Sequence, residues 1–135
     1  SSFAGLCARS VANSSWTVMN KEIPVMPAAP VDSITEQTFP ARVLESKIPV
    51  LIQFWAPWCA PCRMVTPIVE QIAAEHADVL DVVKVNVDEE PALAIQHGVS
   101  SIPAFVVIAD GLQKKSWVGA APKPVLERTL APYLR

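Results

Sequence analysis

Two cysteines separated by two residues, Cys59 and Cys62, are the side chains of this sequence best suited to chemistry. They lie between an apolar run and a segment with helical periodicity, so we expect them at the N-terminus of a helix. Unpaired backbone N–H groups and the positive end of the helix dipole stabilise a thiolate there, which makes Cys59 the expected nucleophile toward a disulfide. Cys62 lies one helical turn further on. We expect it to resolve the mixed disulfide, leaving a Cys59–Cys62 disulfide.

A single Cys-x-x-Cys pair has two other interpretations. It could be half of a zinc site, with Cys7, His76 and His97 as the candidates for the remaining ligands, or a pair of inert buried thiols. No second pair of this kind accompanies it, so we do not expect a metal site. We expect both histidines to lie on helix surfaces and Cys7 to be an incidental thiol. Pro57 and Trp58 beside the pair indicate an exposed apolar rim, which disfavours inert thiols.

The composition is typical of a globular protein. The chain has 135 residues, of which 51% are hydrophobic, and this is enough for the core of one domain. A net charge of −2 with scattered basic residues gives no surface for nucleic acid, so no nucleic-acid partner is expected. No apolar run approaches the roughly 20 residues that span a bilayer, and we expect a soluble protein without a membrane span. The small number of cysteines fits a reducing compartment better than an oxidising one.

The chain divides near residue 31. Residues 1–30 contain paired serines, and Pro24, Pro27 and Pro30 interrupt any regular element. Arg9 precedes the first acidic residue, so this stretch is interpreted as an N-terminal extension or leader: the remnant of an organelle transit peptide, an artificial leader or a plain linker. Residues 31–135 are expected to form the domain.

Within the domain, the patterns predict alternating helices and strands. Helices are expected over 33–46, from the cysteine pair to about 76, over 91–98 and over 124–130, and strands over 50–55, 79–87, 104–108 and 114–118. Asp110-Gly111 marks a hairpin between the last two strands. The expected order is βαβαβαββα, whose first strand no pattern locates. It predicts parallel pairing with one antiparallel edge.

Apolar periodicity defines the expected buried faces of two helices. In the first helix the face consists of Phe39, Val43 and Leu44. In the helix after the cysteine pair it consists of Met64, Val65, Ile68, Val69, Ile72 and Ala73. A proline within that second helix, Pro67, is expected to kink it. The acidic run Asp88-Glu89-Glu90 ahead of Pro91 suits the positive end of the third helix.

The segment from Phe54 to Met64, FWAPWCAPCRM, resembles the active-site segment of the thioredoxin family. Further resemblances follow in order along the chain, and together they cover about residues 31–135. They are Pro67 (the kink proline of the second helix), Lys84 (the strand lysine beneath the active site), Ile102-Pro103 (the cis-proline turn facing the cysteines) and Gly119 (the glycine that lets a substrate backbone approach).

This resemblance implies a fold and an activity. The fold is α/β with thioredoxin topology, a central mixed β-sheet flanked by helices on both faces. The activity is the reduction of disulfides in protein substrates, with a thioredoxin-reductase-type electron donor and without a bound cofactor, because the two sulfurs carry the electrons. The expected protein is a monomer of the cytoplasm or of an organelle stroma or matrix. The implied substrate-binding residues are Trp58, Ala60, Pro61, Ile102, Pro103 and Gly119.

The sequence departs from the family pattern at three positions. Gln53 stands where the family usually has a buried aspartate that takes the proton of the resolving cysteine, and an amide cannot titrate. Ala60 replaces the commoner glycine and Arg63 the commoner lysine. The Gln53 departure favours an alternative function, a binding or scaffold subunit with secondary redox activity. A thiol oxidase or isomerase is the other alternative, although such proteins often carry histidine where this chain has Pro61.

Overall fold

The computed structural model describes residues 31–135, so the expected extension over residues 1–30, with Cys7, lies outside the described residues. Within the described part, five strands form one sheet in the order β1-β3-β2-β4-β5. The strands are β1 (Asp32–Ser33), β2 (Val50–Trp55), β3 (Asp81–Asn86), β4 (Ala104–Ala109) and β5 (Leu112–Val118). The helical elements are η1 (Pro40–Leu44), α2 (Ala60–Glu75), α3 (Pro91–Gln96), α4 (Lys123–Leu130) and η2 (Ala131–Tyr133).

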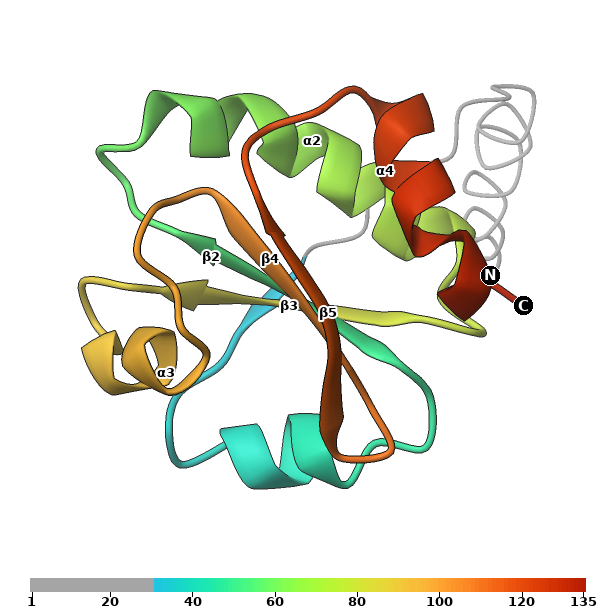
Figure 1. Ribbon diagram of the computed structural model, residues 1–135, viewed down its shortest axis with the longest axis horizontal. Helices are drawn as coiled ribbons and strands as arrows, with labels where there is room; N and C mark the ends of the chain where they lie inside the picture. The colour runs from blue at the N-terminus through green and yellow to red at the C-terminus, as the bar shows by residue number, and fades with distance from the viewer. Residues whose placement is uncertain (1–30) are drawn as a thin grey trace, which may run out of the picture.

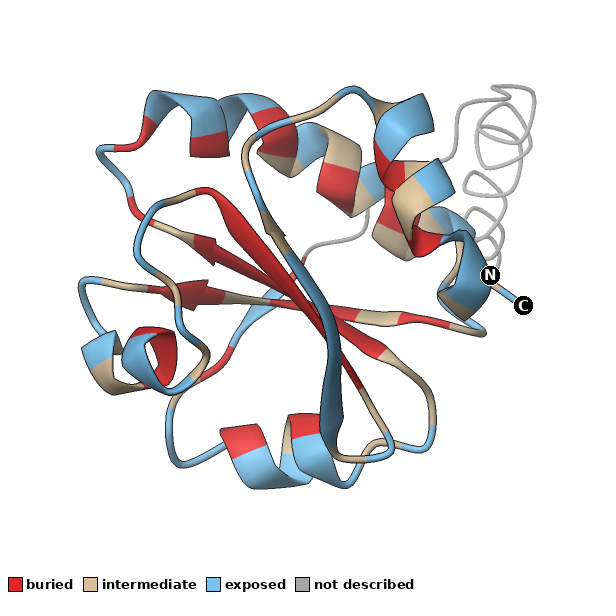
Figure 2. Ribbon diagram, viewed as in Figure 1, coloured by how far each residue is buried: buried red, intermediate tan, exposed pale blue. Residues whose placement is uncertain are grey.

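The sheet is mixed and covered on both faces, as expected. β3 pairs in parallel with β1 and β2, whereas β4 pairs antiparallel with β2 and β5. Helices α2 and α4 lie on one face, and α3 and η1 lie on the other (Figure 1). Each face has its own apolar core, one including Val69 of α2 and Leu126 of α4, the other including Val43 of η1 and Leu93 of α3 (Figure 2). The predicted fold class is therefore confirmed.

The central strand β2 positions the cysteine pair. Its first five residues are buried, which agrees with a strand covered on both faces. Its register places Gln53 between Lys84 of β3 and Phe105 of β4. Because alternate side chains point to the same face, Gln53 shares the α2 face with Leu51, and the chain leaves β2 directly into the loop that carries Cys59.

Two of the expected helical faces need correction. The first helix is only a π-helical turn over Pro40–Leu44, preceded by turns, since Pro40 has no N–H to continue a longer helix. Leu44 is 42% exposed at its end and does not belong to the buried face, unlike Phe39 and Val43. In α2, Met64 is 73% exposed because it lies about 100° around the helix from Val65, outside the stripe that Val65, Val69 and Ile72 bury.

The last hairpin is confirmed, but its second strand is longer than predicted. Asp110 and Gly111 both have positive φ (54° and 75°), as a tight two-residue hairpin turn requires. β5 begins at Leu112 immediately after this turn, whereas the sequence pattern placed it from residue 114. Its residues are mostly exposed, so apolar periodicity could not locate its start.

Of the helices in residues 31–135, none combines the length and apolar character that a bilayer span needs.

Arg42 of η1 ties together the neighbouring strands β1 and β3. Its Nε and Nη2 donate to the two carboxylate oxygens of Asp81 in β3 at 2.8 and 3.0 Å. Its Nη1 donates to Asp32 in β1 at 2.9 Å. The hydrogen bond to Asp81 raises the pKa of Arg42 against the opposing effect of burial, and Asp32 adds to the rise. The short strand β1 is therefore fixed by a side chain as well as by its ladder with β3.

Candidate active site

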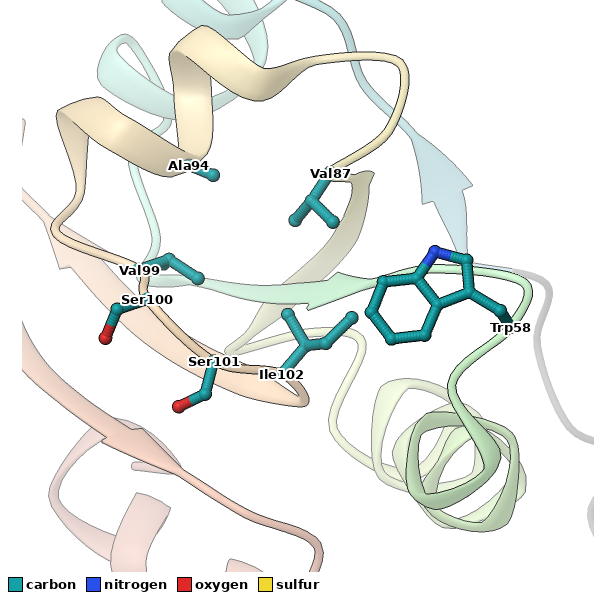
Figure 3. A pocket seen from close by; sticks show the side chains of 7 residues that line it. All are labelled: Trp58, Val87, Ala94, Val99, Ser100, Ser101 and Ile102. Atoms are coloured by element: carbon teal, nitrogen blue, oxygen red, sulfur yellow. The ribbon is translucent and has the colours of Figure 1, made fainter.

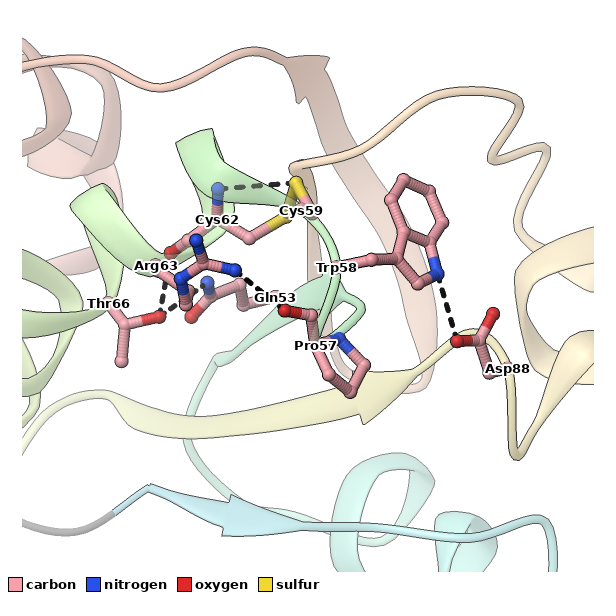
Figure 4. The surroundings of a disulfide bond; sticks show 8 residues. All are labelled: Gln53, Pro57, Trp58, Cys59, Cys62, Arg63, Thr66 and Asp88. Atoms are coloured by element: carbon pink, nitrogen blue, oxygen red, sulfur yellow. Dashed lines mark hydrogen bonds between the residues drawn. A yellow bond between two sulfur atoms is a disulfide. The ribbon is translucent and has the colours of Figure 1, made fainter.

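Cys59 and Cys62 lie at the N-terminus of α2, as predicted, and are joined by a disulfide (Figure 4). Their Cα atoms are 5.3 Å apart. Cys59 is the N-cap residue, with extended backbone angles, and its Sγ accepts a hydrogen bond from the Cys62 N–H at 3.2 Å. Ala60 and Pro61 form the first turn, where a proline costs nothing because its missing N–H would have no partner in the helix. Both are exposed.

Both cysteines are covered by the surrounding protein. Cys59 is 4% exposed and Cys62 fully buried, so the first cysteine is nearly covered, not open. Ala56 is also buried and packs with both, and Val87 and Ile102 pack against this cluster.

Trp58 forms the rim beside the disulfide. It is 67% exposed, which agrees with the expected apolar rim. Its Nε1–H donates to the Asp88 carboxylate at 2.9 Å, a contact between the loops after β2 and β3 (Figure 4). On the other side of the loop, Arg63 Nη1 donates to the Pro57 carbonyl at 2.7 Å. The loop that carries Trp58 is therefore fixed by one hydrogen bond on each side, one to Asp88 and one from Arg63.

An apolar pocket of about 410 Å³ adjoins this rim. Trp58, Val87 and Ile102 point toward one another across it, as Figure 3 shows. The remaining lining residues are Ala94, Val99, Ser100 and Ser101. The lining contains no charged side chain, so the pocket suits an uncharged side chain of a partner. Val87 and Ile102 also pack against the cysteines, which places this pocket next to the disulfide.

The turn opposite the cysteines has the expected form. The Ile102–Pro103 peptide bond is cis, and the Pro103 carbonyl accepts from the Gly119 N–H at 2.8 Å. Among residues 31–135, the backbone of Ile102 has no hydrogen-bond partner and remains available to an extended segment. Gly119 has φ of 109°, a conformation that residues with a Cβ rarely adopt. A Cβ built there meets no atom within 4 Å, so the space above Gly119 is open.

Gln53 and Lys84 are neighbours in the register of β2 and β3 but interact with different groups. Gln53 is 1% exposed, and its amide donates to Thr66 Oγ1 in α2 at 3.3 Å. The Lys84 ammonium lies over the ring of Trp55, 5.0 Å from its centroid. Lys84 thus makes a cation–π contact, and the nearest polar partner of Gln53 is a hydroxyl. A neutral amide with a hydroxyl partner satisfies this buried position without any charge.

The described histidines lie away from the cysteine pair. His76 ends α2 at the far end from the sulfurs, where its Nε2 is 3.8 Å from Glu127 and where Glu75 completes a cluster of possible ligands. His97 was expected on a helix surface, but it is partly buried. Its ring packs against those of Phe39 and Phe54, with centroids 5.2 and 5.8 Å away. Neither histidine is placed to complete a zinc site with the cysteines.

Sequence reasoning missed two residues of this site. Asp88 was assigned to the start of a helix, but α3 begins at Pro91 and Asp88 instead binds Trp58. A usable signal is its position two residues after β3, since parallel strands β2 and β3 end at the same edge of the sheet. Thr66 was not singled out at all. Its spacing of four residues from Cys62 is the signal, because such residues share a helix face.

Comparison with known proteins agrees with this geometry. Residues 30–132 match the family model described as Thioredoxin. Thioredoxin 1 of Synechococcus elongatus is 51% identical over 102 residues, which cover 76% of this chain and 95% of that protein. The chloroplastic M-type thioredoxin of Chlamydomonas reinhardtii is 40% identical over 127 residues, which cover 94% of this chain and 91% of that protein. Thioredoxin of Porphyra purpurea is 42% identical over 104 residues, which cover 77% of this chain and 97% of that protein. With its Cys59–Cys62 pair at the start of α2, this chain belongs to the thioredoxin family.

Proposed function

We propose that this protein reduces disulfides of other proteins, with Cys59 as the nucleophile and Cys62 as the resolving cysteine. The observation that carries the proposal is the position of Cys59 Sγ at the N-terminus of α2, where it accepts the Cys62 N–H. A hydrogen-bond donor and the helix dipole both favour the thiolate over the thiol. Cys59 is also the more exposed of the two sulfur-bearing residues.

The reaction proceeds in two exchanges. The Cys59 thiolate attacks one sulfur of the substrate disulfide, so that a Cys59–substrate disulfide forms, the substrate S–S bond breaks and the other substrate sulfur leaves as a thiolate that takes a proton. The Cys62 thiolate then attacks Cys59 Sγ and expels the second substrate sulfur, which is protonated in turn. The substrate gains two electrons and two protons, and the protein ends with the Cys59–Cys62 disulfide that the structure contains.

The surface around the disulfide supports a protein substrate. The Ile102 backbone is available for pairing with an extended segment, and the Gly119 position leaves space above the chain. We assign substrate contacts to Trp58, Ala60 and Pro61 beside the cysteines, and to Ile102, Pro103 and Gly119 opposite them. Lys84 is assigned a supporting role through Trp55, on which its ammonium lies.

A dithiol donor must restore the reduced pair, and we assign this role to a thioredoxin-reductase-type protein. We further propose that the protein is a monomer that works in a reducing compartment, an organelle stroma or the cytoplasm. The relatives from Chlamydomonas reinhardtii and Spinacia oleracea are named chloroplastic, which supports a plastid stroma. Residues 31–135 would perform the exchange, and residues 1–30 would be an extension or leader.

Insulin reduction by the full chain with dithiothreitol tests the activity. We expect turnover by the wild-type protein and none by Cys59→Ser. Cys62→Ser should accumulate a mixed disulfide on Cys59, and mass spectrometry of the trapped species identifies the bound sulfur. Absence of insulin reduction by the wild-type protein would contradict the proposal. Trapping on Cys62 in a Cys59→Ser protein would reverse the two roles.

Gln53 supports one competing function, a binding or scaffold subunit, because the buried position beneath the cysteines holds a group that cannot move a proton. The two functions differ in turnover. A scaffold subunit would bind its partner equally well with Cys59 and Cys62 both replaced by serine, whereas a reductase would lose its effect on the substrate. The reduction potential of the pair separates either function from a thiol oxidase, whose potential is much less negative.

A further inference from the structure

Thr66 connects the buried amide of Gln53 to the residue that carries the second sulfur (Figure 4). Gln53 lies in the middle of β2, and its Nε2 is 3.3 Å from Thr66 Oγ1. Thr66 Oγ1 is in turn 2.8 Å from the carbonyl oxygen of Cys62, one helical turn earlier in α2. Two consecutive hydrogen bonds therefore join the centre of the sheet to the first turn of α2.

Chemistry fixes the direction of both hydrogen bonds. A carbonyl oxygen can only accept, so the single hydroxyl proton of Thr66 is donated to Cys62. Thr66 Oγ1 must then accept from Gln53, which places the amide nitrogen, and not the amide oxygen, against it. A carboxylate at position 53 could not donate, and it would compete with the Cys62 carbonyl for the Thr66 proton. The arrangement thus needs an amide rather than an acid.

Cys62 is also held through its backbone N–H. This N–H donates to Cys59 Sγ at 3.2 Å in the disulfide form, and the same donor is placed to stabilise the Cys59 thiolate after reduction. Cys62 is fully buried, so no water competes for its backbone. Whatever fixes the backbone of Cys62 therefore also fixes the donor that acts on Cys59.

We propose that Thr66, oriented by Gln53, is a positioning residue that keeps the Cys62 N–H directed at Cys59 Sγ. This inference rests on the dithiol–disulfide exchange proposed above and adds a residue that touches no reacting atom. Threonines in helices commonly donate to the carbonyl four residues earlier without functional effect. Thr66 differs in two respects: a buried amide of the sheet orients its hydroxyl, and the residue that it holds supplies a donor to the nucleophilic sulfur.

The test measures the thiol of Cys59 directly. The full chain is reduced, and the rate of Cys59 alkylation by iodoacetamide is followed between about pH 4 and 10 to obtain the pKa of the thiol. Thr66→Val removes the hydroxyl and keeps the shape, and we expect it to raise this pKa by about half a unit, or to slow alkylation about threefold below the pKa. Thr66→Ser keeps the hydroxyl and should titrate like the wild-type protein.

A double-mutant cycle tests the part played by Gln53. Gln53→Leu removes the amide that orients Thr66 and should shift the Cys59 pKa in the same direction. If the two residues act as one unit, Gln53→Leu combined with Thr66→Val shifts the pKa no further than the larger single change. Additive shifts would mean that Gln53 acts independently of Thr66, and they would overturn the proposal.

Two other results would also overturn it: an unchanged Cys59 pKa in Thr66→Val, or a Thr66→Ser protein that titrates like Thr66→Val. Thermal unfolding of each variant shows whether it is folded, and Thr66→Val is the decisive one because it preserves the shape of a side chain that is only partly buried. The alkylation measurement needs no substrate disulfide. Failure of insulin reduction would therefore count against the proposed function alone, while the Cys59 titration still decides the role of Thr66.

Discussion

Trp58 and Asp88 are 30 residues apart in the chain, yet the Trp58 indole N–H donates to the Asp88 carboxylate at 2.9 Å. The contact joins the loop after β2 to the loop after β3. Trp58 is 67% exposed, so an isolated side chain there would sample several rotamers. The hydrogen bond instead holds the ring at the edge of the pocket that Val87 and Ile102 line.

Removal of this acceptor should weaken substrate binding rather than the fold. We expect Asp88→Ala to lower kcat/KM for insulin reduction about three- to tenfold, or ~0.6–1.4 kcal/mol, the usual net size of one intramolecular hydrogen bond. Asp88→Asn keeps a side-chain oxygen that can accept from Trp58 and is the matched control. Equal losses in both variants would indicate that the charge of Asp88, and not its hold on the indole, matters.

Gly119 offers a second test of the substrate surface. Its φ of 109° should make Gly119→Ala destabilising by about 1–2 kcal/mol in urea unfolding. Gly98 provides a control, because it has φ of 72° and, like Gly119, no atom within 4 Å of a built Cβ. If a substrate backbone approaches Gly119, its alanine variant should lose several-fold more activity than Gly98→Ala at similar stability. Parallel losses in the two variants would mean that strain alone explains the effect.

The sequence predicted the parts of this site that depend on local pattern. A continuous apolar run gave β2, and the position of the cysteines between that run and a helical segment gave the N-cap of α2. The hairpin followed from Asp110-Gly111, whose positive φ angles only a few residue types adopt readily. In each case one short segment contains all the information.

Tertiary contacts were not predictable in the same way. The pairing of Trp58 with Asp88 depends on the strand order, which brings two separate loops to one edge of the sheet. The packing of His97 between two phenylalanines depends on how α3 and η1 share one face. The exposure of Met64 likewise depends on how α2 is rotated against the sheet, which apolar periodicity alone does not reveal.

Arg42 should contribute to stability through the geometry of its guanidinium. Arg42→Lys keeps the charge but cannot bind Asp81 through two nitrogens while also reaching Asp32. We expect a loss of about 1–2 kcal/mol in the free energy of unfolding, since these groups are only partly buried. Urea unfolding measures it. A loss as small as that of an exposed-surface substitution such as Lys115→Gln would show that the network is fully screened by solvent.

The ion pair between Lys123 and Glu75 predicts that the stability of the fold depends weakly on pH in the alkaline range. Lys123 Nζ lies 2.7 Å from Glu75 Oε2, and this hydrogen bond raises the pKa of Lys123 above 10.5. A folded-state pKa above the unfolded value gives stability that is fully present below about pH 10.5 and is lost as the pH rises through the folded value. The difference in urea midpoint between wild type and Lys123→Gln should therefore be constant from about pH 7 to 10 and shrink above that range. A difference that grows with pH would contradict this sign.

The last prediction places an acid at the buried position beneath the cysteines. Gln53 is 1% exposed, so the carboxyl of Gln53→Asp would be desolvated and its pKa raised above the ordinary value of about 3.9. Near neutral pH, such a carboxylate can take the proton of the Cys62 thiol, which the amide cannot do. The same carboxylate cannot donate to Thr66, so the support of the Cys62 backbone is lost. We therefore expect faster resolution of the mixed disulfide together with slower initial attack by Cys59.

A single-turnover reaction with an aromatic disulfide such as Ellman's reagent separates these steps, because each releases one coloured thiolate. Gln53→Asp should slow the first release and accelerate the second, whereas Gln53→Leu should slow the first without accelerating the second. The unfolded aspartate ionises first as the pH rises, so stability falls from about pH 4 up to the folded pKa, by about 1.4 kcal/mol for each unit by which burial raises it. Urea midpoints between about pH 4 and 9 measure this loss. Unchanged release rates and unchanged midpoints in Gln53→Asp would show that position 53 has no influence on Cys62.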